Sequence, residues 1–219
     1  FWQRQYLQGE RRNRLVTYWK QRLSGKLSSL KLPFDYPRPK APTFRARRET
    51  VFLPGDLQKS LFGLGQGQQA TEFMVELAAF NLLLHLYTGQ TDILVGVTTA
   101  NRNQIESVDV IGWLADRVLL RSDLSGSPIF AELVMRIRNV FLGAYQHQAL
   151  PYLEVVKLVN WGGDSGSTPN QCCFSEAPDA NLGTAMEGLE VETLPREQLS
   201  STGDLNVFVG QTSRGLEVR

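Results

Sequence analysis

The fold is decided by residues 71–97, TEFMVELAAFNLLLHLYTGQTDILVGV. Apolar side chains recur there with the spacing of one helical face, at Phe73, Leu77, Phe80, Leu84 and Tyr87. Thr71 is a typical N-cap, and Thr88-Gly89 is a typical helix end. The apolar run Asp92–Val97 that follows is typical of an interior strand covered on both faces. The stretch therefore predicts a buried helix leading into an interior strand.

Working outward, helix and strand patterns alternate along the chain. The predicted helices are 1–31, 57–64, 71–88, the segment after the N-cap Ser127-Pro128, and 153–159. The predicted strands are 49–53, 92–97, 118–121, 171–174, 189–194 and 205–209. This interleaving predicts an α/β or mixed α+β fold in which helices flank a sheet.

The segment Leu32–Pro42 contains four prolines, which exclude a regular helix or a central strand. Phe34 and Tyr36 alternate with these prolines. We expect both aromatic side chains to be buried, so that the segment is an ordered, extended connector.

The composition excludes several classes of function. The net charge is +1, from 23 basic and 22 acidic residues, which predicts no nucleic-acid partner. The apolar stretch 73–87 is too short and too polar for a membrane span, and the N-terminus does not resemble a signal peptide. The adjacent Cys172 and Cys173 predict no disulfide, no spacing predicts a metal site, and the expected location is the cytoplasm.

The chain carries little that predicts chemistry of its own. The two histidines, His85 and His147, lie within or at the end of predicted helices, without a nucleophile nearby in sequence. The motifs of serine hydrolases, phosphate loops and dinucleotide-binding folds are missing. The residues alone thus predict a soluble domain without a self-contained active site.

Several phrases, in order, resemble the C-terminal lobe of condensation domains from nonribosomal peptide synthetases. They are Phe1–Leu7 (FWQRQYL), Tyr18–Leu23 (YWKQRL), Leu32–Pro39 (LPFDYPRP), Asp92–Gly96 (DILVG), Ile111–Trp113 (IGW) with Leu120–Leu124 (LRSDL), and His147–Glu154 (HQALPYLE). The resemblance is strong to about residue 160 and weaker beyond it.

This resemblance implies one lobe of the chloramphenicol acetyltransferase type over residues 1–219. Residues 1–42 would form the first helix and the proline-rich connector, 43–160 the core, and 161–219 a weaker-matching tail. The implied reaction joins two carrier-bound groups: an amine attacks a thioester, and the product is an amide. The implied partners are an N-terminal lobe, peptidyl carrier proteins and adenylation domains. Substrates would arrive on the phosphopantetheine of the carriers, with no cofactor bound directly to this chain.

In the family, the catalytic motif His-His-x-x-x-Asp-Gly belongs to the N-terminal lobe. It does not occur here, so we expect no catalytic residue in this chain and no activity by the chain alone. The resemblance implies that Arg102 faces the aspartate of that motif as an ion pair across the lobe interface. It also assigns interface or structural roles to Trp113, Asp116, Arg117 and His147.

One departure from the family pattern is informative. Leu114-Ala-Asp-Arg117 stands where the family has Phe-Val-Asn-Thr, so a neutral pair has become Asp116 and Arg117. These two could pair with each other or alter the substrate tunnel. Three functions therefore stay open: a lobe of a working condensation domain, a noncatalytic scaffold or protein-interaction platform, and another acyltransferase of the same superfamily.

Overall fold

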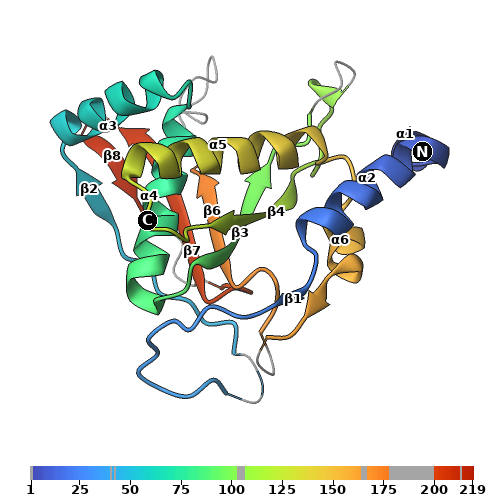
Figure 1. Ribbon diagram of the computed structural model, residues 1–219, viewed down its shortest axis with the longest axis horizontal. Coiled ribbons are helices and arrows are strands. Elements are labelled where there is room, and N and C mark those ends of the chain that lie inside the picture. The colour runs from blue at the N-terminus through green and yellow to red at the C-terminus, as the bar shows by residue number, and fades with distance from the viewer. Residues whose placement is uncertain are drawn as a thin grey trace, which may run out of the picture.

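A six-stranded mixed sheet forms the centre of the molecule (Figure 1). The computed structural model describes residues 2–39, 41, 43–102, 107–163, 167–177, 200–212 and 214–219. The strand order is β2-β8-β7-β6-β3-β4. The strands are β2 (Val51–Leu53), β3 (Asp92–Thr99), β4 (Asp116–Asp123), β6 (Cys172–Glu176), β7 (Leu205–Thr212) and β8 (Gly215–Val218). The β3–β6 and β6–β7 pairs are parallel and the others antiparallel, which confirms the predicted mixed sheet flanked by helices.

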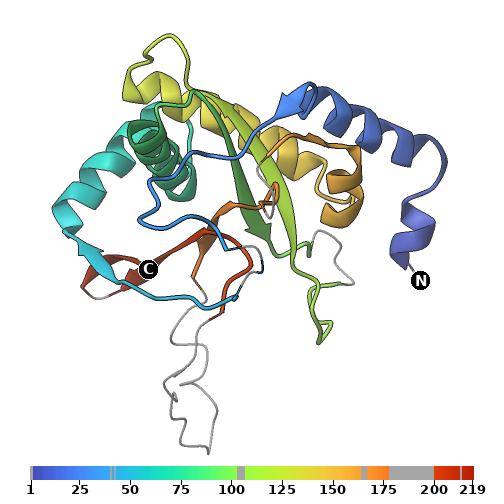
Figure 2. The ribbon, with the colours of Figure 1, turned by 90° about the horizontal axis from the view of Figure 1, so that it is seen from below.

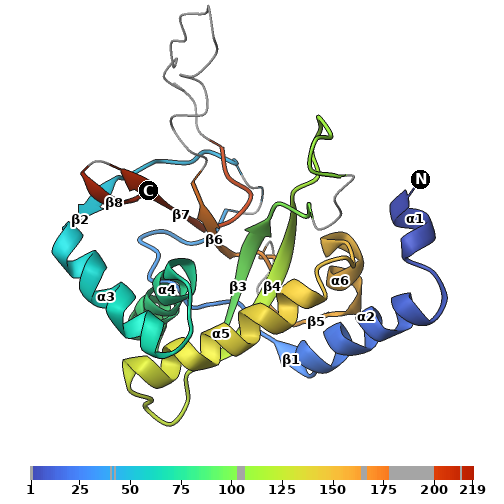
Figure 3. The ribbon, with the colours of Figure 1, turned by 90° about the horizontal axis from the view of Figure 1, so that it is seen from above.

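Three helices cover one face of this sheet, as Figure 3 shows. They are α3 (Gly55–Gly67), α4 (Glu72–Thr88) and α5 (Phe130–Gln146). Phe174 of β6 packs between two aromatic rings of α4, with centroids 5.3 Å from Phe73 and 5.2 Å from Phe80. Aromatic contacts of this kind add to the free energy gained by burying the rings, so they fix α4 on the sheet.

The predicted helix and strand of residues 71–97 are confirmed. Thr71 Oγ1 accepts a hydrogen bond from the Met74 N–H at 3.3 Å, as expected of an N-cap. Gly89 ends α4 with a φ of 68°, a left-handed conformation that glycine adopts without strain. β3 lies between β6 and β4, which explains why its sequence is a continuous apolar run.

The N-terminal segment differs from the single helix predicted to residue 31. It forms α1 (Trp2–Tyr6) and α2 (Gly9–Arg22), and then the short strand β1 (Lys26–Leu27). β1 pairs with β5 (Asn160–Trp161), which follows the helix α6 (Tyr152–Leu158). The helix ends early because the chain turns at Gly25, with φ 77°, into a pairing with a strand more than a hundred residues away.

Two further local predictions were wrong. α5 begins at Phe130 with Ile129 as its N-cap, and not at Ser127, because the Glu132 carboxylate accepts the Ile129 N–H from within the helix at 3.3 Å. In the proline-rich connector, Phe34 is 51% and Tyr36 83% exposed, so the aromatic rings are not buried. An ion pair of Arg38 with Asp204 holds the connector instead. The strand predicted at 189–194 lies outside the described residues.

Glu76 of α4 makes the stability of the fold depend on pH. Burial, together with the charges of Glu72 and Glu176, raises its pKa to about 7. The folded state therefore binds more protons than the unfolded state between about pH 4.5 and 7, and stability is lost as the pH rises through this window.

We expect Glu76→Gln to raise the free energy of unfolding at pH 8 by about 1–2 kcal/mol. The full shift would give more, but water screens this partly exposed side chain. Urea unfolding at pH 5 and pH 8 measures the effect, with the exposed Glu72→Gln as the matched control. A variant that keeps the wild-type loss of stability between the two pH values would contradict the assignment to Glu76.

Candidate functional site

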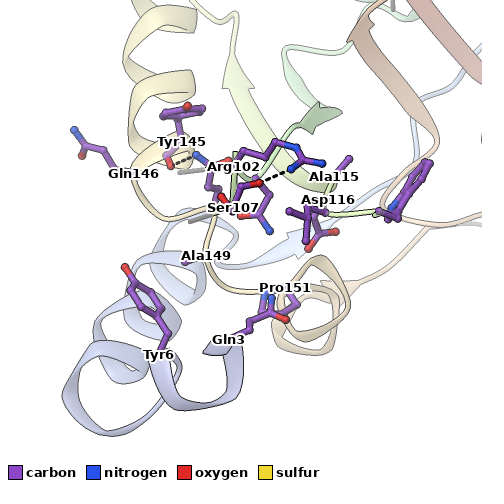
Figure 4. Close-up of a pocket in the computed structure, with 14 residues that line it drawn as sticks. Gln3, Tyr6, Arg102, Ser107, Ala115, Asp116, Tyr145, Gln146, Ala149 and Pro151 are labelled. Carbon is purple, nitrogen blue, oxygen red and sulfur yellow. Dashed lines mark hydrogen bonds between the residues drawn. The ribbon is translucent and has the colours of Figure 1, made fainter. Parts of the chain in front are cut away.

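A groove of about 790 Å³ lies at the end of the sheet where β4 begins (Figure 4). We call it the Arg102 groove. Its walls come from α1, from the segment around Arg102, from the start of β4 and from the end of α5. The lining residues are Gln3, Tyr6, Asn101, Arg102, Ser107, Trp113, Leu114, Ala115, Asp116, Tyr145, Gln146, Gln148, Ala149 and Pro151.

Arg102 organises one wall of this groove. Asn101, with φ 51°, turns the chain after β3, and the following Arg102 guanidinium donates to four backbone carbonyls. The acceptors are the carbonyls of Ser107, Val108 at 3.2 Å, Val110 at 3.0 Å and Gly112 at 3.3 Å. One charged side chain thus holds the segment 107–112 in place. The ion pair expected between Arg102 and the N-terminal lobe stays a prediction.

Asp116 and Arg117 do not pair with each other, although the structure describes both side chains. The Asp116 carboxylate accepts the Arg117 N–H at 2.8 Å and the Tyr152 N–H at 3.0 Å. Tyr152 is the first residue of α6, so Asp116 satisfies one of the N–H groups that a helix start leaves without an intrahelical partner. Arg117 lines a different pocket, with Thr98, Cys173 and Ser175.

His147 has a structural role at the end of α5. Its Nδ1 lies 2.7 Å from the Gly143 carbonyl, which can only accept, so Nδ1 carries the proton. Its ring stacks on Tyr18 of α2 with centroids 3.7 Å apart, and its own carbonyl accepts the Trp19 Nε1–H at 3.1 Å. His147 therefore joins α2 to α5 behind the groove and does not line it.

Trp113 lies at the tip of an exposed apolar segment beside the groove. Figures 2 and 3 show this segment, residues 107–115, projecting away from α4 and α5. Trp113 is 90% exposed and Ile111 is fully exposed, while Val108 and Val110 are also largely in contact with solvent. Apolar side chains clustered in this way are typical of a surface that meets another protein.

The sequence did not predict the roles of Gln3, Tyr6 and Tyr145 in the groove. Tyr6 lies in the FWQRQYL phrase and Tyr145 lies two residues before His147, so both were within or beside recognised segments. The separation of α1 from α2, which brings Gln3 and Tyr6 to the groove, was hidden because the whole segment was expected to be one helix.

Other candidate chemistries find no support among the described residues. His85 lies near the end of α4 with its Nδ1 2.8 Å from the Gln90 carbonyl. Cys172 and Cys173 are buried and free, and burial raises the pKa of the Cys172 thiol to about 12. The described part of the chain brings no three His, Cys, Asp or Glu side chains together as possible metal ligands. None of the described helices has the length and apolar character needed to cross a membrane.

Comparison with known proteins identifies the family. Residues 1–170 match the family model described as the condensation domain. The chain belongs to this family. Its condensation-domain relatives include a linear gramicidin synthase from Brevibacillus parabrevis, 42% identical over 219 residues that cover 99% of this chain and 4% of that protein. The chondramide synthase from Chondromyces crocatus is 37% identical over 218 residues, which cover 99% of this chain and 6% of that protein.

The fold of solved condensation-type structures agrees. The X-domain from teicoplanin biosynthesis superposes with a TM-score of 0.84 at 25% identity, over 99% of this chain and 51% of that chain. This condensation-domain sequence therefore spans about half the length of that structure and a few per cent of the curated relatives.

Proposed function

We propose that this chain is the C-terminal lobe of a condensation domain in a nonribosomal peptide synthetase. Joined to an N-terminal lobe, it would form an amide bond between acyl and aminoacyl groups that carrier proteins deliver as phosphopantetheine thioesters. In this proposal the N-terminal lobe supplies the histidine motif, and this chain supplies the opposite wall of the substrate tunnel.

The observation that carries the proposal is the pairing of the Arg102 groove with the exposed tip around Trp113. The groove is open, and an apolar tip stands at its rim with Trp113 90% exposed. An arrangement of this kind fits a surface that a second lobe completes, because burying the tip would remove apolar area from water. The 51% coverage of the X-domain chain supports the same division into two parts.

The residues at the groove fit a positioning role. Arg102 and Asp116 spend their polar groups on their own backbone, since the first holds segment 107–112 and the second holds the start of α6. Neither histidine of the chain lines the groove. This chain would therefore orient substrates, and proton transfer would depend on the other lobe.

A noncatalytic interaction platform is the second candidate. It is favoured by the Asp116-Arg117 pair, which replaces the neutral pair expected from the family and places a guanidinium beside the sheet. Under this alternative the Trp113 tip would bind a protein partner and no amide would form.

Reconstitution of amide formation from two separately produced lobes tests the proposal. Activity is expected in the mixture and is not expected from this chain alone. A stable complex without amide formation would favour the platform.

A further inference from the structure

A polar pocket lies on the face of the sheet opposite to the helices. Because neighbouring side chains of a strand point to opposite faces, and Phe174 faces α4, Cys173 and Ser175 face the other way. Strand register then places Thr98 and Arg117 opposite each other, and Asn206 opposite Cys173. Figure 3 shows α3, α4 and α5 on the far side of the sheet from this face.

The pocket has a volume of about 350 Å³. We call it the Arg117 pocket. It is lined by Phe44, Thr98, Arg117, Cys173, Ser175, Ser200, Ser201, Thr202, Asn206 and Phe208. Its size is within the range usual for small-molecule sites.

Arg117 is the one charged side chain among these lining residues. It is partly buried, and its guanidinium makes no hydrogen bond or ion pair with any residue that the structure describes. The adjacent Asp116 cannot neutralise it, because that carboxylate is bound to the Tyr152 N–H. A partly buried cation without a partner is costly, so the pocket favours an anion.

The neighbouring groups are neutral hydrogen-bond donors. Ser175 Oγ and Thr98 Oγ1 lie 2.8 Å apart, and their shared hydrogen bond uses one hydroxyl proton and leaves the other to donate. Asn206 Nδ2 donates one of its two protons to Ser201 Oγ at 2.6 Å. One fixed positive charge with neutral donors matches a carboxylate, which a guanidinium can hold with two parallel hydrogen bonds. A phosphate dianion would keep an uncompensated charge.

The electrostatics of Cys173 agree with this placement. Burial raises the pKa of its thiol, and the nearby Arg117 guanidinium opposes that rise. The positive potential of Arg117 therefore reaches the floor of the pocket on β6.

We propose that the Arg117 pocket binds a carboxylate carried by the substrate, and that Arg117 selects acidic aminoacyl groups. The inference rests on the proposed function, in which this chain forms a wall of the substrate tunnel. Arg117 acts here as a specificity-determining residue, while bond formation belongs to the complete domain.

Binding of isosteric substrate mimics tests the inference. N-acetylated aspartyl and glutamyl N-acetylcysteamine thioesters are titrated against the 219-residue chain, alongside their asparaginyl and glutaminyl counterparts. The acidic mimics have one carboxylate each and match the amides in shape. We expect the better acidic mimic to bind about tenfold or more tightly than its amide, as a charged hydrogen bond predicts.

The preference is expected to disappear in Arg117→Gln and to persist in Arg47→Gln. Arg47 is a matched control, because its side chain is 91% exposed and pairs only with exposed Glu49 at 3.8 Å. Equal unfolding midpoints for both variants would show that the fold is kept. Thr98→Ala should weaken the preference in part, because it removes one neutral donor.

Three outcomes would overturn the inference: equal binding of acid and amide, a preference that survives Arg117→Gln, or inorganic phosphate binding as tightly as the acidic mimic. The proposed function fails separately. A two-lobe mixture that joins neutral substrates without an acid preference would keep the function and reject the carboxylate pocket. An acid preference in binding, with no amide formed from any substrate, would do the reverse.

Discussion

Trp19→Ala is expected to lower the free energy of unfolding by about 3–5 kcal/mol, as for other large buried aromatic residues. Trp19 is 1% exposed, and its Nε1–H donates to the His147 carbonyl at 3.1 Å. It also meets the Tyr18 ring edge-on, and Tyr18 stacks on His147. The substitution would leave a cavity between α2 and α5 together with an unpaired carbonyl.

Urea unfolding of the wild type and two variants measures this effect. Trp19→Phe is the matched control, since it keeps most of the apolar volume and removes the N–H donor. We expect it to cost about 1–2 kcal/mol, mainly for the lost hydrogen bond. A loss below about 1 kcal/mol for Trp19→Ala would show that the contact between α2 and α5 does not stabilise the fold.

Arg102→Ala is expected to weaken association with an N-terminal lobe by about tenfold or more, equivalent to about 1.4 kcal/mol. The substitution removes the donor shared by the carbonyls of segment 107–112. Ile111 and Trp113 would then lose the fixed position that an interface requires. It would also remove the cation that family resemblance places opposite the motif aspartate.

Arg136→Ala is the matched control for Arg102→Ala. The Arg136 guanidinium also holds backbone carbonyls, those of Asp123 at 3.0 Å and Ser125 at 2.8 Å, but at the other end of β4. Sedimentation of each variant with the N-terminal lobe gives the affinities. If Arg102→Ala bound as tightly as the wild type, or if Arg136→Ala lost as much affinity, Arg102 would have no specific role at the lobe interface.

Local signals in the sequence were sufficient for the core. Thr71 and Gly89 mark the ends of α4 through interactions within one turn, and the apolar run of β3 follows directly from its interior place in the sheet. Elements that depend on distant partners were harder to predict. α2 ends at Arg22 because β1 pairs with β5, and no residue near Arg22 carries that information.

The candidate site shows the same division. The family phrases drew attention to Arg102 and Trp113, and the departure at Asp116 and Arg117 was visible in the sequence. The sequence could not tell that Asp116 binds the backbone of Tyr152, 36 residues away, nor that Arg117 meets Asn206 in one pocket. Both facts depend on strand register and helix placement, which arise only when the sheet is assembled.

Amide formation by two complementary lobes tests the central claim most directly. The segment that precedes the matched region in the linear gramicidin synthase is a suitable partner, because that protein is 42% identical to this chain over 219 residues. The two parts are mixed with carrier proteins loaded with acyl and aminoacyl groups, and mass spectrometry follows the product. The account predicts an amide only when both lobes are present, and its loss when the histidine motif of the partner is changed to alanine. Amide formation by this chain alone, or a stable two-lobe complex that forms none with any substrate pair, would contradict it.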